Sequence, residues 1–237
     1  MFYLKVLGSV SLYGKTTAVP AGAQQKRRLG LLAVLAIAGG RGISRDRIQS
    51  YLWPESDGSR ARHALDQLVY ATRRALGADP ILAEGQDLRL DLSVVDSDLH
   101  HFDEAIRDTR LADAASGYGG PLLDGFHLSD SRELETWIDV ARSRAEQQYH
   151  KALGTLARES SAKGDHAKSV EWMRKLSVSD PLSASVATGL IEALCRTGDT
   201  TGAIRHARSY QRFVRSELEV DADPRIEEII SSLSAQR

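Results

Sequence analysis

Five polar side chains that can contact nucleic acid recur at helical spacing in the first third of this 237-residue chain. They are Arg60, His63, Gln67, Tyr70 and Arg74. At about 100° per residue they fall within an arc of roughly 80° on one side of a helix. Arginine and glutamine can form paired hydrogen bonds with base edges, and histidine and tyrosine can contact phosphates. The stripe predicts a nucleic-acid contact, and an ordinary solvated helix face is the alternative.

The elements that must position this stripe are two helices joined by a short turn. The opposite, apolar side of the second helix consists of Ala61, Leu65, Leu68, Val69, Thr72 and Leu76. Asp57-Gly58-Ser59 opens this helix and Leu76-Gly77 ends it. The first helix starts after Ser44, a good N-cap, and ends at Trp53-Pro54, because the residue before proline avoids the α region.

A β-hairpin is predicted directly after the second helix. Residues 81–83 and 88–92 are short apolar or alternating runs, and the turn between them contains Gly85. Arg89 alternates with leucines, so we expect it to point away from the core, toward a phosphate or the minor groove. The order helix, turn, helix, wing is common among proteins that lay a helix into the DNA major groove. The wing therefore favours nucleic-acid contact over a solvated face.

The N-terminal residues predict short antiparallel strands over 2–7 and 9–13, followed by a largely buried helix over 24–38. The first turn of that helix is basic and contains Lys26, Arg27 and Arg28. Cations at a helix N-terminus oppose the helix dipole. Two interpretations stay open for this turn, an expected anion and a simple solvated helix start.

From Val95 onward the pattern is helical, with a short helix over 98–106, a loop over 117–125 and a long helix over 131–163. Gly164-Asp165 recurs 34 residues later as Gly198-Asp199, which is the tetratricopeptide period. The signature tryptophans of that repeat are missing. We therefore expect two degenerate repeats that need the preceding helices to complete a core.

Charge is distributed unevenly along the chain. Residues 1–95 hold 13 Lys/Arg against 8 Asp/Glu, and residues 96–237 hold 18 against 24. We expect only the basic half to touch a polyanion. The single cysteine, Cys195, fits a reducing compartment. The longest apolar run, 29–40, is too short for a bilayer, and the N-terminus lacks signal-peptide features, so a cytoplasmic protein without a membrane partner is expected.

Catalytic and metal chemistry are poorly supported by the residues present. His100 and His101 point about 100° apart on a helix and cannot easily share one ion. Gly14-Lys15-Thr16 lacks the spacing and the following helix of a phosphate loop. No histidine stands in a nucleophile–base motif with a serine or with Cys195. We expect no enzyme, no metal and no cofactor.

With these residues laid out, the chain resembles bacterial transcriptional activator domain proteins, including the Streptomyces antibiotic regulatory protein (SARP) type. The similar segments are FYLKVLGSVSLYG, KRRLGLLAVLA, ISRDRIQSYLWPESD, ARHALDQLVYATRRALGAD and YGGPLLDGFHLSDSRELETWI. The resemblance implies an α+β fold, an OmpR-type winged helix over 1–95, followed by an all-α, tetratricopeptide-like domain over 96–237. It also implies binding to direct repeats in promoter DNA, a homodimer and contact with RNA polymerase. Many relatives are the N-terminal part of longer proteins, so the resemblance leaves open whether this chain is a whole protein or a fragment.

In that interpretation the recognition helix covers residues 58–76. Its base contacts would come from Arg60, Gln67 and Arg74. Phosphate or wing contacts would come from Lys26, Arg27, Arg28, His63, Tyr70, Arg73 and Arg89. Asp66 and Ala71 stand where many members carry arginine. These departures favour the alternative function, an interaction scaffold whose winged helix no longer binds DNA specifically and whose helical repeats hold a partner peptide.

Overall fold

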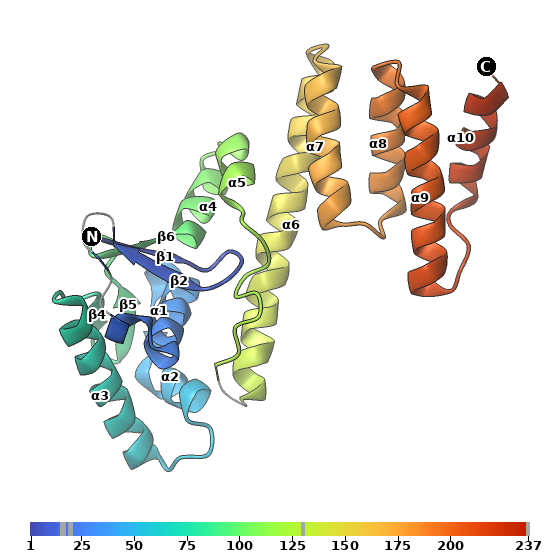
Figure 1. The fold of residues 1–237 in the computed structure, drawn as a ribbon. Coiled ribbons are helices and arrows are strands. Elements are labelled where there is room, and N and C mark those ends of the chain that lie inside the picture. The colour runs from blue at the N-terminus through green and yellow to red at the C-terminus, as the bar shows by residue number, and fades with distance from the viewer. Residues whose placement is uncertain (15–17, 19–20, 129–130, 236–237) are drawn as a thin grey trace. The chain divides into compact units, whose positions relative to one another are not determined.

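The computed structural model describes the chain except residues 15–17, 19–20, 129–130 and 236–237. It forms two compact units, Met1–Gln147 and Gln148–Arg237 (Figure 1). The long helix α6 (Arg132–Ala162) contributes to both units. The predicted fold, a winged helix followed by helices, is confirmed. Within the described residues, none of the helices has both the length and the apolar character needed to cross a membrane.

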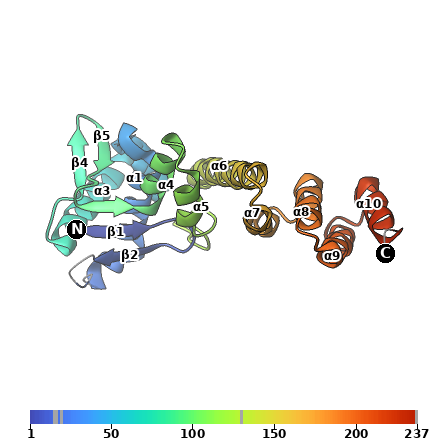
Figure 2. The same cartoon turned by 90° about the horizontal axis from the view of Figure 1, so that it is seen from above.

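The first unit begins with a three-stranded sheet in the order β2-β1-β6. β1 (Phe2–Lys5) pairs antiparallel with β2 (Ser11–Gly14), as predicted. The third strand, β6 (Val95–Ser97), comes from far along the chain and pairs with β1 in parallel, with Tyr3 beside Asp96. In Figure 2 it is the green arrow beside β1, on the side opposite β2. The sheet therefore joins the two ends of the predicted winged helix.

The side chain of Asp98 connects the segment that follows this sheet to the N-terminal residues by hydrogen bonds. Asp98 is the first residue of α4 (Asp98–Arg107), which is followed by α5 (Leu111–Gly117). Its buried carboxylate accepts hydrogen bonds from the backbone N–H groups of Val6 and Leu7, each at 2.9 Å. Burial raises the pKa of this carboxyl group despite these bonds, which act in the opposite direction. Residues 96–147 thus pack with the N-terminal unit, while a domain boundary at residue 95 stays a prediction.

The helix–turn–helix and the hairpin form as predicted. The 3-10 turn η1 (Ala21–Gln24) leads into α1 (Lys26–Ala38), two residues later than expected for the helix start. The 3-10 turn η2 (Gly39–Arg41) and β3 (Ile43–Ser44) then precede α2 (Arg45–Leu52) and α3 (Gly58–Leu76). The hairpin strands are β4 (Ile81–Glu84) and β5 (Asp87–Leu90), and the second sheet has the order β3-β5-β4.

The apolar side of α3 packs into the core of the first unit. Its buried residues are Ala61, Leu65, Val69, Thr72 and Leu76, while Leu68 is half-buried. Burial of Thr72 is compatible with its hydroxyl group because that group donates to the Leu68 carbonyl oxygen at 2.7 Å. The start of α6 closes this unit, where Trp137 packs on Tyr51 with ring centroids 5.4 Å apart.

The second unit contains the predicted repeat. Its helices are the end of α6, α7 (His166–Ser179), α8 (Ala184–Arg196), α9 (Thr200–Leu218) and α10 (Pro224–Ala235). Asp165 and Asp199 cap α7 and α9, so the 34-residue period marks the first helix of each pair. Gly164 and Gly198 precede these caps with φ of 80° and 78°, a conformation that favours glycine.

The excess of acidic residues lies in the first unit, which corrects the expected charge division. Residues 96–147 hold 5 Lys/Arg against 12 Asp/Glu, whereas residues 148–237 hold 13 against 12. The second unit is therefore close to neutral. The charge count over residues 96–237 hides this difference because it combines residues 96–147 with residues 148–237.

Candidate nucleic-acid interface

Helix α3 is fixed at both ends by local chemistry. The Asp57 carboxylate accepts the backbone N–H of Arg60 at 2.9 Å and the Ser59 hydroxyl at 2.8 Å. These hydrogen bonds hold the pKa of Asp57 below its usual range. At the other end Gly77 adopts the left-handed conformation that commonly terminates helices. The helix therefore presents its exposed face at a defined orientation.

All five residues of the predicted stripe are exposed on α3. Tyr70, for example, is 61% exposed, which is unusual for a large aromatic side chain. The Arg60 guanidinium forms an ion pair with Asp57 at 3.0 Å, and its side chain remains 83% exposed. In the described part of the chain, the side chains of His63, Gln67, Tyr70 and Arg74 have no hydrogen-bond or ion-pair partner. The face is thus chemically available to a ligand.

Arg62 is a candidate that sequence reasoning missed. It lies between the stripe and the buried side of α3, nearer the buried side, is exposed, and has no ion-pair partner among the residues that the structure describes. A cation in the first turn of the predicted recognition helix was a usable signal. Its position on the helical wheel adjoins the buried side, so the wheel alone does not separate Arg62 from the buried residues.

Asp66 is neutralised by a residue of the preceding helix. Arg45 Nη1 lies 2.8 Å from Asp66 Oδ1, so the pair bridges α2 and α3. The expected repulsion between Asp66 and a phosphate is reduced by this nearby positive charge. The partners are 21 residues apart, and no local pattern in the sequence reveals the pair.

Arg73 joins α3 to the wing. Its Nε lies 2.7 Å from Asp79 Oδ1, and its Nη2 donates to the Ile81 carbonyl oxygen at 3.1 Å. Asp79 in turn accepts the backbone N–H of Ile81 at 3.1 Å. The arrangement sets the direction in which the hairpin leaves the helix.

Arg89 differs from its predicted role as a free side chain. It forms an ion pair with Glu84 across the hairpin and approaches the Gly40 carbonyl oxygen at 3.4 Å. A Cβ at Gly42 would meet its Cγ at 2.7 Å, so glycine allows this close packing at a φ of 72°. The side chain is only 29% exposed, because it packs against the α1–α2 connection.

The basic first turn of α1 lies beside the α2–α3 turn. A hollow of about 460 Å³ is lined by Lys26, Arg27 and residues 53–56, among others. Lys26 and Arg27 are exposed, whereas the Arg28 guanidinium donates to the Gly22 carbonyl oxygen. The structure thus gathers two of the three predicted cations near the start of α3.

The two adjacent histidines have structural partners. His101 Nε2 lies 2.7 Å from Asp96 Oδ2, and its ring stacks on Tyr3 at 6.0 Å between centroids. Among the described residues, no group of three or more His, Cys, Asp or Glu side chains is arranged to hold a metal ion. The surface built by α3, the wing and the α1 turn is therefore the candidate site in the first unit.

Comparisons with known proteins point in one direction. The profile of the bacterial transcriptional activator domain family matches residues 93–233, more than half of the chain. The regulatory protein AfsR of Streptomyces griseus is 25% identical over an alignment of 231 residues that covers 94% of this chain and 24% of that protein. The structure of Mycobacterium tuberculosis EmbR in complex with a low-affinity phosphopeptide aligns with a TM-score of 0.65 and 21% identity. That alignment covers all of this chain and 65% of the EmbR chain.

Proposed function

The chain belongs to the bacterial transcriptional activator domain family, and on this premise we propose that it regulates transcription by binding specific sequences in double-stranded DNA. Helix α3 would enter the major groove, with the β4–β5 hairpin as the wing. The observation that carries the proposal is the exposed face of α3, where four polar side chains have no partner among the described residues. A capped helix with such a face beside a hairpin is how winged-helix proteins read DNA.

Base contacts are assigned to Arg60, Gln67 and Arg74. Arginine pairs with guanine and glutamine with adenine through two hydrogen bonds each, and each good pair contributes about 1–3 kcal/mol of discrimination. Arg60 would exchange its exposed ion pair with Asp57 for a base, at little cost, because such surface pairs contribute about 0–1 kcal/mol. His63 and Tyr70 would contact phosphates.

Lys26 and Arg27 are assigned to the phosphate backbone near the start of α3. Their position beside the α2–α3 turn supports this role, because backbone contacts fix the register of a recognition helix. We add Arg62 to these phosphate contacts, since it is exposed and unpaired among the described residues.

Arg28, Arg73 and Arg89 take a different role in the proposal. Each already donates to a carbonyl oxygen of the first unit, and the latter two also form ion pairs. We assign them to holding α1 and the wing in place for DNA contact. They would influence binding through the position of these elements.

The remaining functional assignments rest on the resemblance of this chain to the family. Residues 96–237 would mediate homodimerisation or regulatory contacts, and two copies would occupy direct repeats at a promoter. A modest positive charge over residues 1–95 supports paired binding, because a single domain with few phosphate contacts binds weakly at physiological salt. Contact with RNA polymerase belongs to the same proposal.

The test is selection of genomic DNA fragments with the purified chain at low and at physiological salt. An enriched direct repeat that is retained at physiological salt supports the proposal. Sequence-independent binding that disappears with salt would overturn it and favour the scaffold function.

A matched pair of variants then tests the assigned face on the selected DNA. Arg74→Glu should weaken binding at least about 100-fold, since it removes a base contact and adds repulsion. Lys151→Glu, at an exposed position in the second unit, should change the affinity less than about twofold. Circular dichroism melting should show that both variants fold, and unchanged affinity of Arg74→Glu would remove that residue from the site.

A further inference from the structure

Helix α9 carries a row of arginines that the proposed DNA contact does not use. Arg205, Arg208, Arg212 and Arg215 are spaced by three and four residues, so they share one side of the helix. All four are exposed. The exposed positions interspersed on this side are Thr201, Ser209 and Ser216. No carboxylate of α9 lies on this face, because Glu217 projects well to one side.

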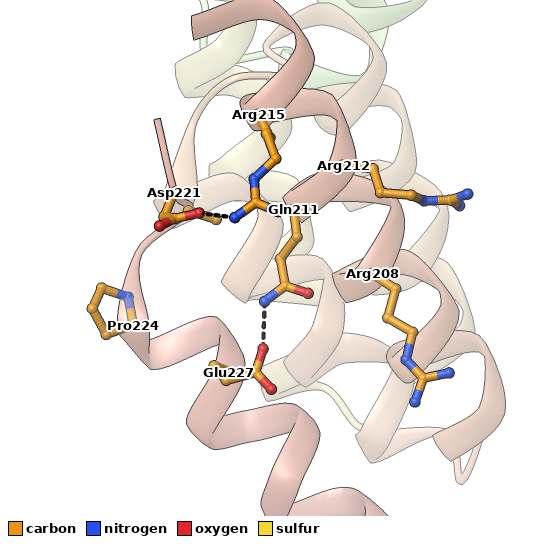
Figure 3. Close-up of a pocket in the computed structure, with 8 residues that line it drawn as sticks. Arg208, Gln211, Arg212, Arg215, Asp221, Pro224 and Glu227 are labelled. Carbon is orange, nitrogen blue, oxygen red and sulfur yellow. Dashed lines mark hydrogen bonds and ion pairs between the residues drawn. The ribbon is translucent and has the colours of Figure 1, made fainter. Parts of the chain in front are cut away.

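The arginines of the row differ in their partners. Arg215 forms an ion pair with Asp221, and the neighbouring Gln211 donates to Glu227 Oε2 at 2.6 Å. Arg208 and Arg212, in contrast, have no carboxylate partner among the described residues. Figure 3 shows these two side chains extending away from Asp221 and Glu227. Two adjacent guanidinium groups with unused donors remain at the centre of the row.

Two hollows adjoin these central arginines. One, of about 820 Å³, lies between α9 and the start of α10 and includes Ala222 and Pro224 in its wall. The other, of about 270 Å³, includes Thr201 and Ile204. Arg208 and Arg212 line both hollows, so they form the ridge between them. A ligand that crossed this ridge would meet the two guanidinium groups at its centre.

The charges of the second unit favour a short acidic ligand over a nucleic-acid duplex. Residues 148–237 are nearly neutral, with 13 Lys/Arg and 12 Asp/Glu, so the unit lacks the general positive field that attracts a polyanion. Asp221 and Glu227 also stand in the wall of the larger hollow, where a long phosphate backbone would meet them, whereas a short segment centred on Arg208 and Arg212 need not extend to these two carboxylates. Arginine instead forms paired, geometrically specific hydrogen bonds with individual carboxylates.

We propose that the α9 face built around Arg208 and Arg212 binds a short acidic segment of a partner protein. Arg205 would extend the row toward the start of the helix. The interaction goes beyond the proposed DNA contact and uses none of its residues. Carboxylates spaced by three or four residues on a helical segment would match the spacing of the arginines.

The test is fluorescence anisotropy of the full chain with a labelled 15-residue helical peptide that carries glutamates at three- and four-residue spacing. A peptide with glutamine at the same positions is the ligand control. We expect Arg208→Gln/Arg212→Gln to weaken binding of the glutamate peptide at least about tenfold at about 0.15 M salt. Lys151→Gln/Lys163→Gln removes two exposed charges elsewhere in the same unit and should change binding less than about twofold.

Several outcomes would overturn the proposal. Equal binding of the glutamine peptide, or an equal loss in the two double variants, would show that the face does not recognise carboxylates. Displacement of the peptide by random duplex DNA or by inorganic phosphate at matched charge concentration would assign the face to phosphates instead. Concentration-dependent self-association lost in Arg208→Gln/Arg212→Gln would make a second copy the occupant. Binding of the selected promoter DNA should be unchanged in this variant, so failure here leaves the DNA proposal intact.

Discussion

Helices α3 and α9 are built on nearly the same local plan. Each has 19 residues, an aspartate N-cap and a left-handed residue at its C-cap. The exposed stripe of α3 starts at residue 60 and that of α9 at residue 205, and both continue at offsets of 3, 7 and 10. The stripes differ in chemistry. On α3 they mix arginine with histidine, glutamine and tyrosine, whereas on α9 all four positions are arginine.

The neighbours of the two helices separate their functions. α3 is preceded by the helix α2 and followed by the wing, and a basic turn lies at the α2–α3 connection. α9 lies in a repeat between α8 and α10, and hollows border its arginines. A mixed set of donors and acceptors can distinguish bases, while arginine alone recognises anions. The comparison shows that the elements around a stripe of exposed cations decide which ligand the stripe can bind.

The largest expected difference concerns the buried sides of the two helices. Leu65 of α3 is fully buried, so Leu65→Ala should lower the free energy of unfolding by about 2–5 kcal/mol through lost burial and a cavity. The buried side of α9 contains small residues beside larger ones, and among the small ones Ala207 is fully buried. Ala207→Leu should cost about 1–3 kcal/mol through overpacking. Urea unfolding followed by circular dichroism measures both changes in the free energy of unfolding. A stabilised Ala207→Leu variant would show that the core around Ala207 has space for a larger side chain.

Charge reversal on the exposed sides should separate the two ligands. Arg60→Glu/Arg74→Glu should reduce affinity for the selected DNA at least about 100-fold and leave binding of the acidic peptide within about twofold. Arg208→Glu/Arg212→Glu should show the reverse pattern. Anisotropy titrations with both ligands provide the four measurements. A parallel loss of both ligands in either variant would contradict the separation of the two faces.

The second unit should also become less stable at acidic pH because of His206 on α9. Burial, and secondarily the charge of Arg174, lowers the pKa of His206 below its usual 6.5. The folded state thus favours the neutral ring, so this contribution to stability is complete above pH 6.5 and is lost as pH falls through the lowered pKa. Melting curves between pH 7.5 and 5 should show a smaller pH dependence for His206→Gln. An identical slope in the two proteins would assign the dependence to other groups.

The smallest expected effects are at the C-caps, and they have opposite signs. Gly77 ends α3 at φ 63°, so Gly77→Ala should destabilise the first unit by about 1 kcal/mol. Glu219 ends α9 at φ 55°, a conformation that costs a non-glycine residue energy. Glu219→Gly should therefore stabilise the second unit by up to about 1 kcal/mol. Differential scanning calorimetry would detect both shifts, and a lower melting temperature for Glu219→Gly would mean that its side chain contributes more than the strain.

Local features of the sequence predicted much of the fold and the exposed face of the candidate site. Ser44, Asp57 and the Trp53-Pro54 pair bounded the helix–turn–helix correctly. The period between Gly164 and Gly198 located the repeated helices. The wheel of α3 separated its buried side from its exposed side, with Leu68 only half-buried. These features act within a few residues, so backbone geometry alone connects them to the sequence.

Only the tertiary structure decided which cations are free. Arg73, Arg89 and Arg28 were expected to face DNA, but each has intramolecular partners, while Arg45 neutralises Asp66. A helical or strand period states which side of an element a residue occupies, and it carries no information about what lies opposite. Arg62 is the opposite case, because it adjoins the buried side on the helical wheel of α3 and yet is exposed.

The sequence by itself therefore determined most of the helices and the hairpin, with their caps and amphipathic sides, although it did not predict β3, β6 or α5. The tertiary structure determined how residues far apart meet: β6 beside β1, Asp98 under the backbone of Val6 and Leu7, and the division of the chain at Gln147. The physical reason is that such contacts depend on the packing of whole elements against one another. Their free energy comes from burial and hydrogen bonding between segments about 90 residues apart, for which no local pattern exists.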